Sequence, residues 1–475
     1  MPFRLSYQKS VAVIGGGIAG LSAAANLAER GFSVKLFEKC SYLGGKLGSW
    51  TFESNGETLR TEHGFHAFFR QYYNLLSFMQ KIGSAQYLIP IDDYLILYAD
   101  GSRQSFKNID NTPFFNVLSM ANLGVVRYRD MLLNRYDLRL LDLFRYDERN
   151  TFRNYDNMPL SEFIRLTRVP PKMQRVFASF ARAFFAEPHQ MSTAELIKSF
   201  HFYFLSNDQG LLYDVLNDDF QFSFIQPVMK FLREHHAEIY LNSEVENILY
   251  QDGKFNICNE WFDYCVLAAD VKHVPIIISK SPSLHQFKDF YSKAMSLKTS
   301  ARYALWRVWT DRFENGAYPY FVFTDRFRCL DSISFYHRFE QSSVEWSKKN
   351  GGGIFELHSY ALPENLARER EIKNAFLDEL FHYLPELKGF KIVHEYFQIK
   401  DDFTAYHTSL YGQRPETRTE IPGLFLAGDW VKTSHPFMLM EAAYTTGALA
   451  ANYIMKNEGL CENQLFAVPE RGLLA

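Results

Sequence analysis

The sequence lacks the cysteine spacing, the charge excess and the long apolar runs that mark several classes of protein. Its five cysteines are scattered over 475 residues without a CxxC pair, which fits a reducing compartment and argues against a disulfide framework or a cysteine metal site. Lys and Arg number 51 against 54 Asp and Glu, so no positive field favours nucleic acid as a partner. No uninterrupted run of about 18 apolar residues, the length that spans a bilayer, is found.

Export signals and internal repeats are lacking as well. The opening MPFRLSYQKSVAVIGG has no apolar run of signal-peptide length before a cleavage site, so we expect a cytoplasmic protein. The length suggests two or three domains, and because no low-complexity linker separates them, we expect domains that share segments. Aromatic residues, in contrast, make up 16% of the chain. This surplus indicates a large apolar ligand or a surface that enters lipid.

A glycine-rich turn near the start predicts a dinucleotide site. SVAVI reads as a strand and IAGLSAAANLAER as the helix that follows it. Gly15, Gly17 and Gly20 have the spacing G-x-G-x-x-G, in which the first makes the turn, the second admits a pyrophosphate and the third lets the helix pack on the strand. The N–H groups at the start of the helix, near Ile18 and Ala19, point at that anion.

Charged residues and more glycines follow the second strand, FSVKLFEK. Glu38 at its end can accept hydrogen bonds from ribose hydroxyls, and Lys39 is the next candidate contact. SYLGGKLGSW then places Gly45 and Lys46 where backbone and a cation could meet the rest of a larger dinucleotide. These features alone fit either NAD or FAD, since both carry an ADP half.

The far end of the chain favours FAD. GLFLAGDW ends a strand with Gly428 and Asp429, and Met440 and Ala443 lie at the start of a helix rich in Ala and Gly. A second contact roughly 400 residues after the first suits the long FAD molecule better than NAD.

The segments between these ends predict a second domain. Residues 76–226 read mostly as helix, with strong patterns in PLSEFIRLTR, KMQRVFASFARAFF and AELIKSFHFYFL and no strand alternation. Residues 301–361 alternate in the manner of an antiparallel sheet. We therefore predict an α/β fold, α+β overall, in which a Rossmann-like FAD-binding domain is interleaved with a substrate-binding domain of helices and antiparallel sheet. The predicted FAD-binding domain comprises 1–75, 225–285 and 415–460, and the substrate-binding domain 76–224 and 286–414.

With these motifs in place, the chain resembles the FAD-dependent amine oxidase and carotenoid desaturase superfamily over nearly its whole length. It is most similar to the β-carotene desaturase/methylase branch, the isorenieratene synthase type. The resemblance rests on three segments, EHGFHAFFRQYYNL, FHFYFLSNDQGLLYDVLNDDF and AGDWVKTSHPFMLMEAAYTTGALAAN. The first also resembles the Glu-x-Gly-Leu-His-x-Phe-Phe run of plant-type phytoene desaturases, with Phe65 in place of the Leu.

The resemblance implies roles for particular residues. Gly64, Phe65 and His66 would lie beside the flavin ring, with His66 as a candidate proton acceptor. Val245 in SEVENILY would belong to the strand whose backbone meets adenine. Many relatives have Met-Glu-Gly-Ala at this point, and here Ala442 stands in place of the glycine. Its methyl group leaves slightly less room for the cofactor to approach the backbone at the last contact. For Arg70 two interpretations stay open, a contact on the pyrophosphate side and a simple pair with an acid.

The implied reaction is desaturation of a hydrophobic isoprenoid, a carotenoid. A hydride moves from a ring or chain carbon to flavin N5, and a base or water takes a neighbouring proton, with a methyl shift between these steps if the branch assignment holds.

A flavin amine oxidase on the same fold is the alternative, although Leu439 stands where such enzymes often have an aromatic residue that guides the amine. A flavin-free scaffold would explain the glycine turn but not the GDW and MEAA tail. No metal constellation is found, and the electron acceptor stays open.

A carotenoid-like substrate is confined to lipid, so the resemblance also predicts peripheral attachment to the cytoplasmic membrane. The helical block 112–205, with its FARAFF and FHFYFL faces, is the candidate surface. The alternative is that these faces form the substrate tunnel or ordinary core.

Overall fold

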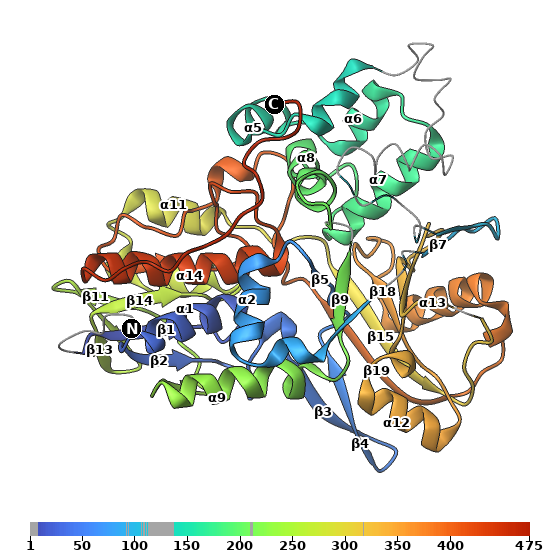
Figure 1. The fold of residues 1–475 in the computed structure, drawn as a ribbon, viewed down its shortest axis with the longest axis horizontal. Helices are drawn as coiled ribbons and strands as arrows, with labels where there is room; N and C mark the ends of the chain where they lie inside the picture. Colours follow the sequence, from blue (N-terminus) through green and yellow to red (C-terminus); the bar gives the residue numbers. More distant parts are fainter. Residues whose placement is uncertain are drawn as a thin grey trace.

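The computed structural model describes residues 8–475 except 92, 94, 106, 108, 109, 111, 113–136, 210, 211 and 317. Figure 1 shows two sheets side by side, with the parallel sheet at the left under α14 and the larger antiparallel sheet at the right against α13. Helices α5 to α8 lie above them in this view. This arrangement confirms the predicted α/β class with an added antiparallel sheet, whereas the two domain boundaries stay a prediction.

The parallel sheet has five strands, and helices or small strands cover both of its faces. Its order is β10 (Glu238–Tyr240), β2 (Ser33–Phe37), β1 (Ser10–Ile14), β14 (Tyr264–Leu267) and β20 (Leu424–Leu426). Val11 and Val13 of β1 pack against α1 (Ile18–Glu29) and α14 (Leu439–Asn457), while Ala12 and Ile14 face the opposite core. Burial on both faces explains why β1 reads as a continuous apolar run.

Helices α1 and α14 pack with their backbones close together, so that the two ends of the chain meet. A Cβ on Gly447 would stand 2.1 Å from the carbonyl oxygen of Ala19, and the Ser22 hydroxyl donates to the Tyr444 carbonyl at 2.7 Å. A Cβ on Gly20 would stand 1.9 Å from the Gly15 carbonyl oxygen, which is the close helix-to-strand packing expected of the third glycine.

The second sheet has seven strands and is antiparallel except between β16 and β7. Its order is β19 (Ile392–Lys400), β15 (Tyr303–Thr310), β18 (Ile354–Ser359), β17 (Ser332–Phe335), β16 (Phe321–Thr324), β7 (Leu95–Leu97) and β8 (Arg103–Ser105). Trp306 and Leu357 share a core with α13 (Glu369–Tyr383). Strand alternation therefore turns Leu305 and His358 toward the opposite face.

The structure also describes further helices and three smaller sheets. The helices are α2 (Tyr73–Lys81), α5 (Glu148–Tyr155), α6 (Leu160–Thr167), α7 (Pro171–Ala183), α8 (Thr193–Phe200), α9 (Gln226–Glu234), α10 (Val274–Ser279), α11 (Lys288–Ser296) and α12 (Gln341–Asn350). The smaller sheets pair β3 (Ser49–Ser54) with β4 (Glu57–Glu62), β5 (Phe68–Phe69) with β9 (Tyr213–Leu216) and β6 (Leu88–Pro90), and β11 (Leu249–Gln251) with β12 (Lys254–Ile257) and β13 (Glu260–Phe262).

Two secondary-structure predictions are wrong. The block 76–226 contains β6 to β9, which were missed because strands of three or four residues are too short to show alternation. Val245 lies outside the strands, since β11 begins only at Leu249. The helical patterns of the same block are confirmed by α6, α7 and α8, and the part of the block at 113–136 lies outside the described residues.

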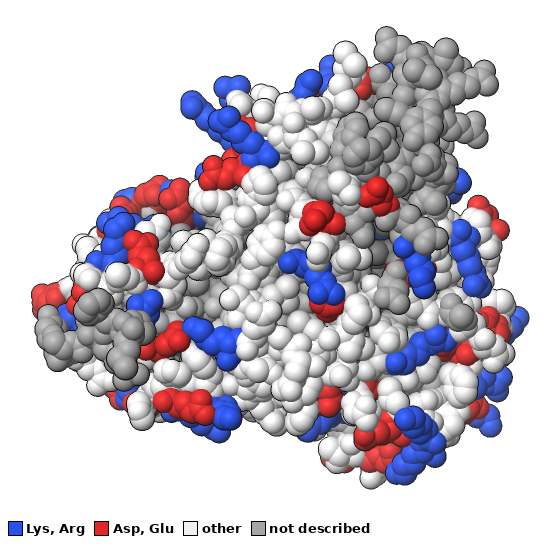
Figure 2. All heavy atoms as spheres, in the orientation of Figure 1, with Lys and Arg blue, Asp and Glu red and all other residues white. Residues whose placement is uncertain are grey.

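The visible face of the molecule carries charges of both signs. Figure 2 shows Lys and Arg interspersed with Asp and Glu around a broad uncharged area. Among the described residues, no helix combines the length and the apolar character needed to cross a membrane.

Replacing Gly447 with alanine should destabilise the protein, because the added methyl group would stand 2.1 Å from a backbone oxygen of α1. Overpacking of this kind costs about 1–3 kcal/mol, so we expect a lower midpoint of thermal unfolding. Gly412→Ala is the matched control, since a Cβ there meets no described atom within 4 Å. Equal midpoints for the two variants would contradict the close packing of α1 on α14.

Candidate active site

A cavity of about 680 Å³ runs from the glycine turn at β1 past the start of α14 to the face of the antiparallel sheet. It lies at the carboxyl ends of the parallel strands, where open α/β sheets bind their ligands. The cofactor and catalytic residues named from the sequence line it with one exception, Gly20, which is in the packing beneath. Those that line it are Gly15, Gly17, Ile18, Ala19, Glu38, Lys39, Gly45, Lys46, Gly64, Phe65, His66, Val245, Gly428, Asp429, Met440 and Ala443.

The glycine turn leaves an open cradle at the N-terminus of α1. Gly17 is the N-cap residue and, among the described residues, no side chain caps the helix, so its first N–H groups face the cavity without a competing side chain. A Cβ on Gly17 would meet no described atom within 4 Å, whereas one on Gly15, at φ +107°, would stand 2.5 Å from the Ala268 carbonyl oxygen. The turn therefore fits a phosphate group held by backbone N–H and the helix dipole.

Glu38 shapes the turn and faces the cavity. Its two carboxylate oxygens accept hydrogen bonds from the N–H groups of Gly16 at 2.7 Å and Cys40 at 2.8 Å. Each oxygen keeps a lone pair for a ribose hydroxyl. Beside it, Lys39 Nζ lies 2.8 Å from His273 Nε2, a neighbour that the sequence did not indicate.

The C-terminal contacts converge on the same space. The Gly428 N–H donates to the Thr446 hydroxyl at 2.9 Å, and Asp429 accepts from Thr404 at 3.0 Å. Lys46 Nζ lies 4.0 Å from an Asp429 oxygen, so residues far apart in the chain form one polar end of the cavity. Leu439, which opens α14, has φ +48°, a strained conformation for a leucine at a ligand site.

Two histidines of the stretch EHGFHAFFRQYYNL line the cavity wall. His66 Nδ1 donates to the Gly64 carbonyl at 2.7 Å, and burial together with nearby His63 lowers the pKa of His66 to about 4. Burial also lowers the pKa of His63, although Asp402 partly opposes this effect. Both rings are therefore neutral at neutral pH. Tyr303, whose hydroxyl lies 2.7 Å from His63 Nε2, was not found from the sequence.

The rest of the cavity is walled by aromatic rings. Phe65 stacks on Phe321 with ring centroids 4.5 Å apart, and Phe185 stacks on Phe403. Other rings come from the α7 region, the segment after α8, the small sheet of β5 and β9, and the seven-stranded sheet with the residue after β18: Phe69, Phe180, Phe184, Tyr203, Phe204, Tyr213, Tyr303, Phe323 and Tyr360. The aromatic faces of the helical block thus line the cavity, as the tunnel alternative predicted.

Arg70 does not line this cavity. Its guanidinium binds Asp214 at 2.7 Å, and the residue is not among those that line the cavity. The structure therefore favours the simple ion pair over a contact with the cofactor.

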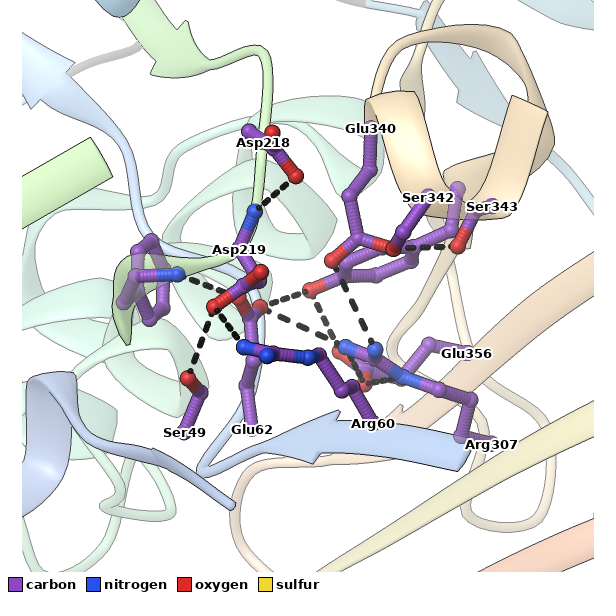
Figure 3. Close-up of polar contacts among 12 residues, drawn as sticks. Ser49, Arg60, Glu62, Asp218, Asp219, Arg307, Glu340, Ser342, Ser343 and Glu356 are labelled. Atoms are coloured by element: carbon purple, nitrogen blue, oxygen red, sulfur yellow. Dashed lines mark hydrogen bonds and ion pairs between the residues drawn. The ribbon is translucent and has the colours of Figure 1, made fainter. Parts of the chain in front are cut away.

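A buried ionic cluster supports the wall from behind (Figure 3). Arg307 is fully buried. Its guanidinium nitrogens lie 2.7 Å from a carboxylate oxygen of Glu356, 3.4 Å from one of Glu62 and 3.8 Å from one of Glu340. Burial opposes ionisation of Glu356, but Arg307 and His358 outweigh it and lower the pKa of this carboxyl to about 2. Burial and the neighbouring carboxylates raise the pKa of Glu62, and burial raises the pKa of Glu340 to about 7.

This cluster fixes the end of β4 just before the two histidines. The Tyr336 hydroxyl lies 3.2 Å from both Glu62 and Glu356, and the Phe220 N–H donates to Glu62 at 3.1 Å. Arg307 also lies over the Tyr336 ring at 3.7 Å. Because Glu62 is held on several sides, Gly64 and its neighbours have little freedom to move out of the cavity wall.

The chain matches a family model and has relatives of known name. The model of the flavin containing amine oxidoreductases matches residues 18–455. Carotenoid phi-ring synthase of Streptomyces griseus is 32% identical over 98% of this chain and 91% of its own length, and the protein of the same name from Chlorobaculum tepidum is 27% identical over 99% and 92%. Cyclohexylamine oxidase from Brevibacterium oxydans has a TM-score of 0.65 at 15% identity, covering 94% of this chain and 99% of its own, a likeness that shows the fold.

Gly17→Val should lose flavin without losing the fold. The backbone φ of −74° suits valine and the side chain has room, but it would fill the space where the pyrophosphate is expected. We expect FAD to bind at least about tenfold more weakly, measured by titrating the apoprotein and by the flavin-to-protein absorbance ratio. Gly412→Val, which is equally unobstructed and outside the cavity, should keep its flavin. A yellow Gly17→Val protein with normal affinity would contradict this assignment.

Glu340→Gln should flatten part of the dependence of stability on pH. The folded-state pKa of Glu340, about 7, is above the usual 4.5, so its contribution is complete below pH 4.5 and is lost as the pH rises through 7. The variant should lack this loss, about 1–3 kcal/mol of unfolding free energy, in urea titrations at several pH values. Glu345→Gln on the exposed side of α12 is the control. The same slope in Glu340→Gln and wild type would contradict the prediction.

Proposed function

Because this chain belongs to the flavin containing amine oxidoreductase family and is an FAD-dependent oxidoreductase, we propose that it desaturates the end ring of a carotenoid. The observation that carries the proposal is the aromatic wall of the cavity next to the cofactor cradle. A hydrocarbon ring is held by apolar contacts and shape, and such a wall supplies both. The two relatives named carotenoid phi-ring synthase support this class of substrate.

The residues that line the cavity fit FAD. The uncapped start of α1 and the open face of Gly17 would hold the pyrophosphate, and Glu38 the ribose. Gly428 and Asp429 with the start of α14 would hold the other half of the cofactor. When bound there, FAD supplies the acceptor for the hydride, at flavin N5, that leaves the substrate.

The protein's own contribution is orientation and exclusion of water. Phe65 and Phe321 form a stacked pair that fixes one wall, and Phe185 with Phe403 forms a second. A dry cavity protects a substrate cation from capture by water, which is required if a methyl group is to shift between loss of the hydride and loss of the proton. We include this shift in the proposal, since it converts a β-ring toward an aromatic ring.

The alternative, amine oxidation, has less support in this cavity. Leu439 and Met440 present aliphatic surface where an aromatic guide for an amine was expected. The carboxylate of Asp402 lies at the wall and could attract an amine, but His63 Nε2 already contacts it at 3.4 Å.

Because a carotenoid is confined to lipid, the proposal includes uptake of the substrate from a membrane surface.

Expression in cells that already make β-carotene tests the proposal. We expect a new pigment with an aromatic end ring, identified by chromatography and mass spectrometry of the extract. Gly17→Val is the matched control and should leave the pigments unchanged. Unchanged pigments in cells that contain the flavin-loaded protein would contradict the proposal, and a longer conjugated chain without a changed ring would contradict ring desaturation.

A further inference from the structure

His358 is a buried histidine that lines the cavity and that the sequence did not indicate. It lies near the end of β18, and only 4% of its surface is exposed. Its Cε1 and Nδ1 lie 3.5 and 3.9 Å from the place where a Cβ on Gly64 would stand. This edge of the ring therefore faces the segment that the resemblance places beside the flavin.

The opposite edge of the ring faces the ionic cluster. His358 Nε2 lies 3.0 Å from Glu356 Oε1, and Glu356 in turn bonds Arg307, the centre of the cluster in Figure 3. The carboxylate approaches Nε2 without the alignment of a hydrogen bond, but its negative charge still favours the neutral tautomer that carries the proton on Nε2. In that tautomer the lone pair is on Nδ1, to which no described residue donates a hydrogen bond.

The other two histidines of the wall are less suited to accept a proton. His66 uses Nδ1 to donate to Gly64, and among the described residues no carboxylate forms an ion pair with its ring. Both ring nitrogens of His63 lie within 3.2 Å of the Tyr303 hydroxyl. His358 alone among these three combines a free nitrogen with a carboxylate contact at 3.0 Å.

We propose that His358 is the catalytic base of this cavity and takes, on Nδ1, the proton that leaves the substrate, with Glu356 as its positioning residue. This inference rests on the proposed function. Each desaturation breaks two C–H bonds: one hydrogen leaves as hydride, the chemistry that FAD supplies, and the other leaves as the proton that forms the new N–H bond. The electron pair of the second C–H bond becomes the new C=C bond. Glu356 stabilises the imidazolium that results.

The groups around His358 that carry or can gain charge are few. Glu356 is on its own strand and Arg307 is behind that carboxylate, on β15. His66, on the segment opposite, is close enough to feel its charge, and the Tyr360 ring lies 5.4 Å away. Glu356→Gln, which removes the charge of that carboxylate, should therefore lower kcat and leave KM unchanged.

Variants of His358 in the purified, flavin-loaded protein test the proposal with a carotenoid in detergent micelles. His358→Gln should keep its FAD content and its KM, while kcat falls by about 100-fold or more. His358→Ala should regain part of its activity when imidazole is added. His382→Gln, an exposed histidine on α13, is the matched control and should behave as wild type.

A second measurement does not depend on turnover. Diethyl pyrocarbonate modifies unprotonated imidazole nitrogens, so His358 should be labelled in the wild-type protein, as mapped by mass spectrometry of its peptides, and bound carotenoid should protect it. If His358→Gln failed to fold, the labelling of the wild-type protein and the imidazole rescue of His358→Ala would still test whether His358 is the base. Wild-type kcat in His358→Gln, or a His358 that is not labelled, would overturn the inference. Wild-type protein that converts no carotenoid would instead overturn the proposed function.

Discussion

The close packing of α1 on α14 is the contact on which the rest of this structure depends. The two helices come from opposite ends of the chain, and Gly447 lets the backbone of one approach the backbone of the other at Ala19. This contact brings Gly428, Asp429 and the start of α14 to the cavity that the glycine turn opens. A long dinucleotide can therefore be bound along its whole length only when both ends of the chain have folded together.

A second constraint is the shortage of positive charge around Arg307. Three carboxylates share one buried guanidinium, and isolated buried charges are costly enough that such a group is protonated instead. Glu356 has the best contact and stays ionised, whereas Glu62 and Glu340 are the ones that hold protons more tightly. The cluster thus fixes the wall at Gly64 and also keeps a carboxylate in place behind His358.

Sequence reasoning found the cofactor end of the site because its signal is local. The turn from Gly15 to Gly20 and the carboxylate at Glu38 belong to one βαβ unit, so their spacing alone predicts their geometry. The cluster gave no such signal, because Arg307 and Glu62 are 245 residues apart. His358 lies on a strand whose residues are all buried, and alternation cannot show which buried face meets a cavity. The short strands β7 and β9 depend on partners distant in the chain, β16 and β5.

On the proposed function, one flavin nucleotide and one carotenoid ring meet in this cavity. This meeting can be observed by adding β-carotene anaerobically to the flavin-loaded protein and following the flavin absorption band. We expect the carotenoid to bleach the band and a primary amine to leave it unchanged. If amines bleach the band, or if no carotenoid affects it, the cavity does not bring a carotenoid ring to the flavin.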